Sequence, residues 1–106
     1  MMIDDATLQN ALDACPTPLY LFDQQVLNDR ITRLRASLPS RIKLCYAMKA
    51  NPFIVLEASA LADCVEACSP GEVLICANAG VPFEKIVLSG VWKDRRCLDD
   101  LFQADR

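Results

Sequence analysis

The chain has 106 residues, of which 53% are hydrophobic, 24% charged and 7% aromatic, and this mixture excludes a disordered or fibrous protein. Eleven Lys and Arg residues against fourteen Asp and Glu residues give a net charge of -3, so nucleic acid is not an expected partner. The length allows one small domain and excludes a complete (β/α)8 barrel, which needs about 250 residues.

Compartment and redox state follow from the apolar segments and the cysteines. No apolar run approaches the roughly 18 residues of a membrane span, and the N-terminus lacks the basic start of a signal peptide, so a cytoplasmic protein without a membrane partner is expected. The six cysteines lie in apolar segments, which favours reduced thiols over a disulfide framework or a metal site. The chain has no His, so it contains no Ser-His or Cys-His nucleophilic pair.

The N-terminal third predicts two helices around a short extended segment. A helix around residues 8–12 ends before Pro16, and residues 19–22 form a short β-type run. Asp23 is a predicted N-cap for a helix over residues 24–38, where apolar residues follow helical spacing.

The rest of the chain predicts three strands that alternate with helices, over residues 42–48, 64–68 and 86–90. These strands begin 22 residues apart, twice in succession, which is typical of parallel βαβ units. The apolar run of the first strand predicts burial on both faces. A fourth strand would begin near residue 108, so the chain stops at the edge of a unit.

Helix starts and stops lie between these strands. Pro52 is placed to begin one helix, and Ser69-Pro70-Gly71-Glu72 has the spacing of a capping box that opens the next, which ends at Gly80. Asp94 is the predicted cap of a last helix.

Lys49 is the residue with the clearest chemical meaning in the sequence. In parallel α/β folds the reactive groups lie at the carboxyl ends of strands, and Lys49 directly follows the first predicted strand. A lysine that is partly desolvated there has a nucleophilic amine, as Schiff-base chemistry requires. Position alone leaves the alternative of a solvated lysine at a strand end.

The segment around Lys49, Cys45-Tyr46-Ala47-Met48-Lys49-Ala50-Asn51-Pro52, resembles the Tyr-Ala-x-Lys-Ala-Asn motif of pyridoxal-phosphate-dependent amino-acid decarboxylases. These are the diaminopimelate, ornithine and arginine types, which have the alanine-racemase-like barrel. Three further segments, in the family's order, are similar to its other N-terminal motifs: Thr17 to Asp23, Val65 to Glu72 and Ile86 to Lys93.

The resemblance implies a fold for the whole chain. We expect an α/β fold made of the N-terminal βα units of a (β/α)8 TIM barrel of the alanine-racemase-like type, with about three strands. Residues 1–106 then form one partial cofactor-binding domain, in which residues 17–23 are an initial strand and residues 42–106 are three βα units.

The resemblance also implies roles for individual residues. Lys49 matches the lysine that holds pyridoxal 5'-phosphate as a Schiff base, and Ala47 matches a small residue under the cofactor. Glu66 matches an acidic residue near the lysine amine, although the family often has Asp there, and Lys49 is its expected partner. Ser69 matches the following turn, with a capping role as the alternative. For Lys93 a surface role competes with a role in the site.

The implied reaction is decarboxylation of a small amino-acid substrate, as in polyamine or lysine biosynthesis. The family's phosphate loop, stacking His and C-terminal β-domain belong to later segments, so we expect the chain to be inactive alone. A missing C-terminal part or a second copy is then the expected partner. The alternatives are a truncated, non-catalytic remnant or interaction domain and, less favoured by the Asn51-Pro52-Phe53 continuation, a racemase of the same fold.

Overall fold

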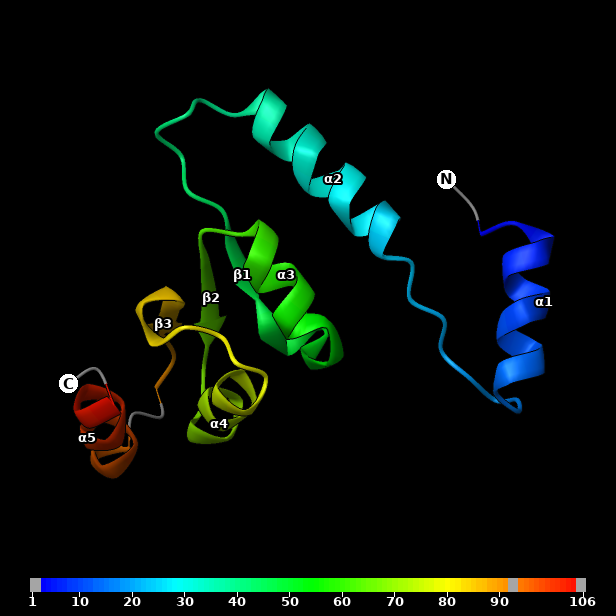
Figure 1. Ribbon diagram of the computed structural model, residues 1–106. Helices are drawn as coiled ribbons and strands as arrows, with labels where there is room; N and C mark the ends of the chain where they lie inside the picture. Colours follow the sequence, from blue (N-terminus) through cyan, green and yellow to red (C-terminus); the bar gives the residue numbers. More distant parts are fainter. Residues whose placement is uncertain (1–2, 92–93, 105–106) are drawn as a thin grey trace.

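The computed structural model describes residues 3–91 and 94–104, with side chains 97, 101, 102 and 104 left aside. Helices and short strands alternate along the chain (Figure 1). The helices are α1 (Asp5–Ala14), α2 (Gln24–Ser37), α3 (Val55–Leu61), α4 (Pro70–Asn78) and α5 (Arg95–Ala104), and the strands are β1 (Cys45–Ala47), β2 (Cys64–Ala67) and β3 (Ile86–Leu88). Three 3-10 turns complete the fold: η1 (Met48–Ala50), η2 (Pro52–Ile54) and η3 (Phe83–Lys85).

The three strands form one parallel sheet in chain order, β1-β2-β3. β1 pairs with β2 so that Ala47 is opposite Glu66, and β2 pairs with β3 so that Glu66 is opposite Val87. Each strand is followed by a helix before the next strand, which is the predicted βα repeat. The predicted α/β fold with three parallel strands is therefore confirmed.

The hydrophobic core lies between one face of this sheet and helices α3 and α4 (Figure 1). Its buried members come from the sheet, from η1, from the two helices and from the loop after α4: Met48, Val55, Val65, Ala67, Val73, Cys76 and Val81. Val65 and Ala67 are fully buried because alternate residues of β2 point towards the helices. Near the centre of this core the Cys76 thiol donates to the Met48 sulfur across 3.3 Å.

The opposite face of the sheet is not covered by the described residues, which corrects the prediction that the first strand is buried on both faces. Cys45 is exposed and Val87 is 46% exposed, and both lie on the face that Glu66 shares. Only β1, a part of the predicted first strand, is paired in the sheet. Directly before it, the N–H of Leu44 donates to the Asp63 carboxylate at 2.7 Å instead of to a neighbouring strand. A buried apolar run marks a strand but does not determine which faces are covered.

The predicted helix caps are confirmed at three positions. Asp23 accepts hydrogen bonds from the N–H groups of Gln25 and Val26, and Asp94 accepts one from Arg96. Ser69 accepts from the N–H of Glu72 at 3.2 Å. Side-chain oxygens at these positions satisfy amides that the first helical turn leaves unpaired, and this explains where α2, α4 and α5 begin.

The segment between α1 and α2 was expected to contain a short strand at residues 19–22. It is extended but pairs with no strand among the described residues, and Tyr20 is fully exposed. A β-type run needs a neighbouring strand for its hydrogen bonds, and the apolar pattern alone does not supply one. α1 therefore lies apart from the sheet at the end of this segment (Figure 1).

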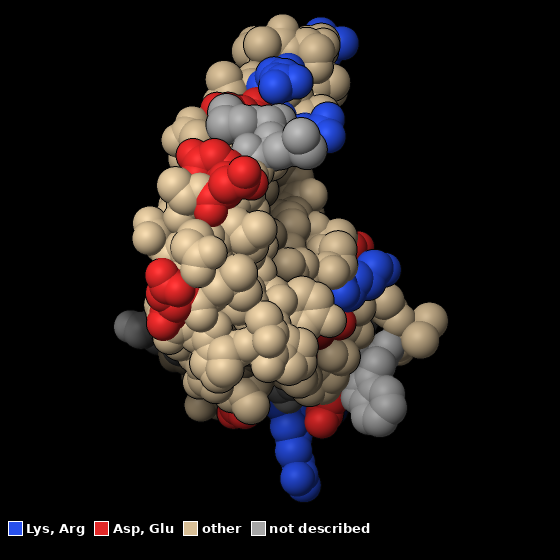
Figure 2. Space-filling view, turned by 90° about the vertical axis from the view of Figure 1, so that its right-hand side faces the viewer, with Lys and Arg blue, Asp and Glu red and all other residues tan. Residues whose placement is uncertain are grey.

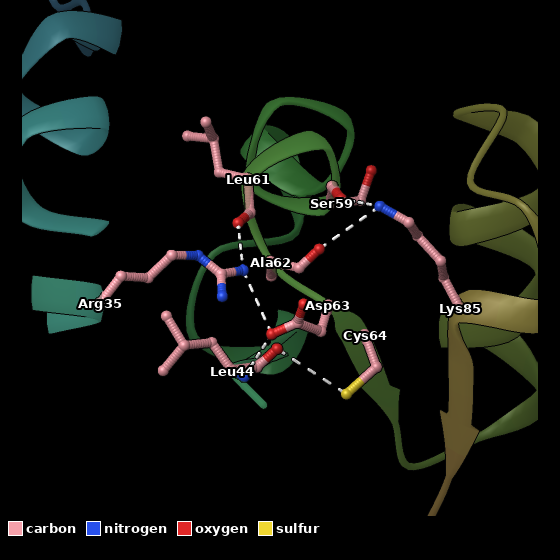
Figure 3. A network of polar contacts seen from close by, with 8 residues as sticks. All are labelled: Arg35, Leu44, Ser59, Leu61, Ala62, Asp63, Cys64 and Lys85. Atoms are coloured by element: carbon pink, nitrogen blue, oxygen red, sulfur yellow. Dashed lines mark hydrogen bonds and ion pairs between the residues drawn. The ribbon is translucent and has the colours of Figure 1, made fainter. Parts of the chain in front are cut away.

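A polar network at the C-terminal end of α3 joins α2, α3 and the turn before β3 (Figure 3). Arg35 of α2 donates to the Leu61 carbonyl at 2.9 Å and forms an ion pair with Asp63 at 3.1 Å. From the other side, the Lys85 ammonium donates to the carbonyls of Ser59 at 2.7 Å and Ala62 at 3.3 Å. Two cations thus bind carbonyls that have no partner within the helix, at the end where the helix dipole is negative.

Charged side chains of both signs are scattered over the face of the molecule seen in Figure 2, amid mostly uncharged surface. Among the described residues, no helix is both long enough and apolar enough to cross a bilayer.

Candidate functional site

Lys49 lies in the tight turn that follows β1, at the carboxyl end of the sheet. Met48, directly before it, is fully buried, whereas Lys49 itself is exposed. The turn η1 closes when the N–H of Asn51 donates to the Met48 carbonyl at 3.1 Å. A buried anchor next to an exposed amine fixes the backbone while it leaves the lysine side chain accessible to a ligand.

Tyr46 stabilises this turn by a hydrogen bond to the residue that follows it. Its phenol donates to the Asn51 carbonyl at 2.7 Å, and the Asn51 side chain in turn accepts from the N–H of Phe53. Partial burial raises the pKa of the Tyr46 phenol above its usual range, against a smaller opposing effect of the bond to Asn51. The phenol therefore remains a donor at neutral pH, and the Tyr and Asn of the motif have a physical role in shaping the lysine turn.

Ala47 and Glu66 lie side by side on the open face of the sheet, since they are partners in the β1–β2 register. Their neighbour on β3 is Val87. These three residues form a row across the open face with the carboxylate in the middle, flanked by one methyl group and one branched apolar side chain. A small side chain at Ala47 leaves room above the sheet next to the carboxylate.

The Glu66 carboxylate is bound by Ser89, directly after β3, rather than by the lysine. Its Oε1 accepts a hydrogen bond from the Ser89 hydroxyl at 2.6 Å. Among the described residues no ion pair joins Glu66 to Lys49, although the sequence had indicated Lys49 as the partner. The carboxylate is half-buried, so a polar partner offsets part of the cost of removing it from water.

Ser69 and Glu72 are both engaged in opening α4. The Ser69 hydroxyl accepts from the Glu72 N–H, and the Glu72 carboxylate accepts from the Cys68 N–H at 2.6 Å. The predicted capping role of this pair is therefore present. The Glu72 carboxylate bonds to the residue directly before the N-cap, Cys68, rather than to the N-cap itself. Any ligand of Ser69 would have to share its hydroxyl with this bond.

The structure brings some of the predicted residues together and leaves others apart. Ala47 and Glu66 are adjacent, and Lys49 follows Ala47 by two residues at the same end of the sheet. Lys93 lies outside the described residues. Ser89 was missed, because only the strand register reveals it. The motif contained Tyr46, but its bond to Asn51 across the lysine turn was not foreseen.

Two thiols complete the open face below the carboxylate. Cys45 and Cys64 are register partners on β1 and β2, and both are free. Partial burial raises the pKa of the Cys45 thiol to about 11, with further contributions from the hydrogen bond and charge of Cys64 and from the charge of Glu66. Within residues 3–91 and 94–104, no group of three potential ligands is placed to hold a metal ion.

The chain has clear relatives among curated proteins, although no family model matches it. It is 30% identical to the diaminopimelate decarboxylase of Aquifex aeolicus over 107 residues, which cover 99% of this chain and 25% of the relative. The diaminopimelate decarboxylase of Bacteroides thetaiotaomicron is 39% identical over 85 residues, or 73% of this chain and 21% of the relative. The chain thus spans about a quarter of the length of these relatives.

Solved structures agree with the sequence matches. The fold superposes on a lysine decarboxylase from Selenomonas ruminantium with a TM-score of 0.74 and 24% identity, covering 92% of this chain and 26% of that one. A protein from Aquifex aeolicus gives a TM-score of 0.73 and 30% identity, covering 92% and 25% respectively. In sequence and fold, the chain therefore corresponds to the N-terminal portion of the pyridoxal-phosphate-dependent amino-acid decarboxylase family with the alanine-racemase-like barrel.

Proposed function

We propose that this chain supplies the lysine strand of a pyridoxal-phosphate-dependent amino-acid decarboxylase, with Lys49 as the residue that holds the cofactor. The observation that carries the proposal is the exposed Lys49 amine, in a turn fixed by Tyr46 and Met48, at the end of the sheet where Ala47 and Glu66 form the open face. The similarity to diaminopimelate decarboxylases gives the class of reaction. Diaminopimelate is accordingly the first substrate to test.

The described side chains fit the cofactor by their chemistry. Pyridoxal phosphate has an aldehyde that requires a primary amine, and Lys49 presents one. Its flat ring needs a small neighbour, and Ala47 leaves that space beside the carboxylate of Glu66. When bound, pyridoxal phosphate supplies an electron-withdrawing ring that takes up the electron pair released as carbon dioxide leaves.

Each residue of this chain then has a defined task. Lys49 would hold the cofactor through its Nζ amine. The Tyr46 phenol keeps the lysine turn closed through Asn51. Glu66 presents a carboxylate oxygen on the open face to accept a hydrogen bond from a bound ligand. Ser69 lies in the turn after β2, where its hydroxyl is shared with the start of α4.

Binding and activity are expected to require further polypeptide. The uncovered face of the sheet and the extended segment with Tyr20 offer surface to a partner that supplies the remaining strands or to a second copy of the chain. The described cysteines are all free, which fits the reducing setting of the cytoplasm. We therefore place the protein in the cytoplasm. Its proposed substrate is a small amino acid.

The proposal is tested by trapping the cofactor on the chain. Pyridoxal 5'-phosphate is added, the mixture is reduced with borohydride, and the modified lysines are mapped by mass spectrometry. We expect modification of Lys49 at least about fivefold above that of the exposed Lys43, because Lys49 follows β1 at the carboxyl end of the sheet, where parallel α/β folds place their reactive groups, whereas Lys43 precedes β1. The yield should rise when the remaining part of the Aquifex aeolicus relative is added as a separate polypeptide.

A Lys49→Arg variant is the matched control, since it keeps the charge but cannot form the adduct. Equal modification of Lys43 and Lys49, even in the assembled protein, would contradict the proposal. That result would favour the second candidate, a non-catalytic interaction domain. Its supporting observation is that Tyr20, Phe53 and Val91 are almost completely exposed, as expected for residues that contact a partner.

A further inference from the structure

Ser89 connects the third strand to the carboxylate of the candidate site. Its N–H donates to the Ala67 carbonyl at 2.9 Å, so it continues the pairing of β3 with β2 by one residue. Side chains alternate along a strand, which places the Ser89 side chain on the face of Val87, the register partner of Glu66. The Ser89 hydroxyl then reaches Oε1 of Glu66 at 2.6 Å, a short and strong contact for a hydroxyl and a carboxylate.

Gly90 allows the chain to turn away directly after this contact. Its φ is +83°, a conformation that residues with a Cβ rarely adopt. A Cβ on Gly90 would also lie 3.3 Å from the Cys68 carbonyl oxygen. The close approach of the end of β3 to the end of β2 therefore depends on glycine at this position.

The direction of the hydrogen bonds around Ser89 follows from counting donors. A serine hydroxyl has one hydrogen, and Ser89 gives it to the Glu66 carboxylate, which can only accept. The Cys68 sulfur lies 3.4 Å from the Ser89 oxygen, so in that contact the thiol is the donor. Cys68, Ser89 and Glu66 form a chain of bonds in which every donor points towards the carboxylate.

We propose that Ser89 is a positioning residue that fixes the Glu66 carboxylate on the open face beside the lysine turn. A glutamate side chain has three rotatable bonds, and the bond to Ser89 restricts them by tying Oε1 to β3. Oε2 accepts no hydrogen bond from the described residues, so it is left to accept one from a donor on a ligand, such as an ammonium group. This inference rests on the proposed function, because it assigns Glu66 to the same site.

The test combines a double-mutant cycle with a conservative replacement. The chain, Ser89→Ala, Glu66→Gln, the double variant and Ser89→Thr are each treated with pyridoxal 5'-phosphate and borohydride between pH 6 and 9. The rate at Lys49 is divided by the rate at Lys43. We expect Ser89→Ala to lower this ratio about three- to tenfold and to change its pH profile, with Ser89→Thr restoring both. In the Glu66→Gln background Ser89→Ala should have no further effect.

The proposal would be overturned if Ser89→Ala and Glu66→Gln lowered the Lys49-to-Lys43 rate ratio independently of each other. An unchanged ratio in Ser89→Ala would overturn it as well. Cys68→Ala is the matched control, since it removes a neighbour of Ser89 but keeps the bond to Glu66. The NMR signal of the Glu66 side-chain carboxyl provides a readout without cofactor. Its chemical shift should change in Ser89→Ala and should be close to the original value again in Ser89→Thr. If it does so while Lys49 is modified no faster than Lys43, even with the remaining part of the Aquifex aeolicus relative added, the proposed function fails and the positioning of Glu66 stands.

Discussion

At the scale of single residues, Cys45 is the thiol whose ionisation the fold changes most. Three effects oppose the ionisation of the Cys45 thiol. Partial burial is the largest, and the neighbouring Cys64 thiol and Glu66 carboxylate add to it. The pKa of Cys45 is therefore raised from 9.0 to about 11. Because the folded chain holds this proton more tightly than the unfolded chain, raising the pH above 9.0 lowers the free energy of unfolding.

We predict that alkylation of Cys45 becomes faster with pH well beyond pH 9, since the thiolate is the reacting form. The rate is measured with iodoacetamide and peptide mapping, while circular dichroism confirms that the chain is folded at each pH. A Cys64→Ala variant removes one hydrogen bond and one charge, so its Cys45 should react faster at a given pH. A rate that levels off near pH 9 would contradict the raised pKa.

The residue scale also shows why part of the site could not be predicted. Lys49, Ala47 and Asn51 are neighbours in the sequence, so a local motif is enough to find them. Ser89 is 23 residues from Glu66, and their contact depends on the register between β2 and β3. Hydrophobic periodicity locates strands to within a few residues, whereas a shift of one residue in register would move Ser89 to the other face.

At the scale of elements, α3 depends on its neighbours. It has only seven residues, a length at which an isolated helix is not stable in water. Its buried face contacts the core through Val55 and Ala58, and its C-terminal carbonyls are bound by Arg35 and Lys85. The two cations come from opposite sides, one from α2 and the other from the turn before β3 (Figure 3).

We expect Lys85→Met to lower the free energy of unfolding by about 1–2 kcal/mol, because the carbonyls of Ser59 and Ala62 lose a charged donor while the apolar stem is kept. Urea denaturation followed by circular dichroism measures the change. Lys43→Met is the matched control on an exposed lysine, with an expected change within about 0.5 kcal/mol. Equal effects of the two variants would mean that the Lys85 contacts contribute no stability.

Helices were predicted more completely than strands, and the reason is the range of the signals. Asp23, Ser69 and Asp94 each bond to amides two or three residues away, so the signal and its structural effect are local. The first strand begins at Cys45 rather than at Ile42, because Leu44 bonds to Asp63, a residue 19 positions later. The covered and open faces of the sheet likewise depend on helices that are distant in sequence.

At the scale of the whole molecule, the described chain is less compact than a single domain of its length. Its radius of gyration is 16.6 Å, against about 13 Å expected for a compact domain of 100 residues. The difference comes from its N-terminal part, since α1 and α2 contain no buried residue and α1 lies apart from the sheet (Figure 1).

Removal of residues 1–16 should therefore change the free energy of unfolding by less than about 0.5 kcal/mol, because no buried contact is lost. Thermal and urea unfolding of the shortened and complete chains provide the comparison. A loss well above about 1 kcal/mol would show that α1 packs on the rest of the molecule in solution.

The sulfur contact between Met48 and Cys76 links the chemistry of the core to its motions. Met48 is fully buried, so peroxide can oxidise its thioether only when the helices separate from the sheet. The sulfoxide is larger and polar, and it would not fit back beside Cys76. A single opening event during oxidative stress would thus leave a lesion that outlasts it until the sulfoxide is reduced, directly before the lysine on which the proposed chemistry depends.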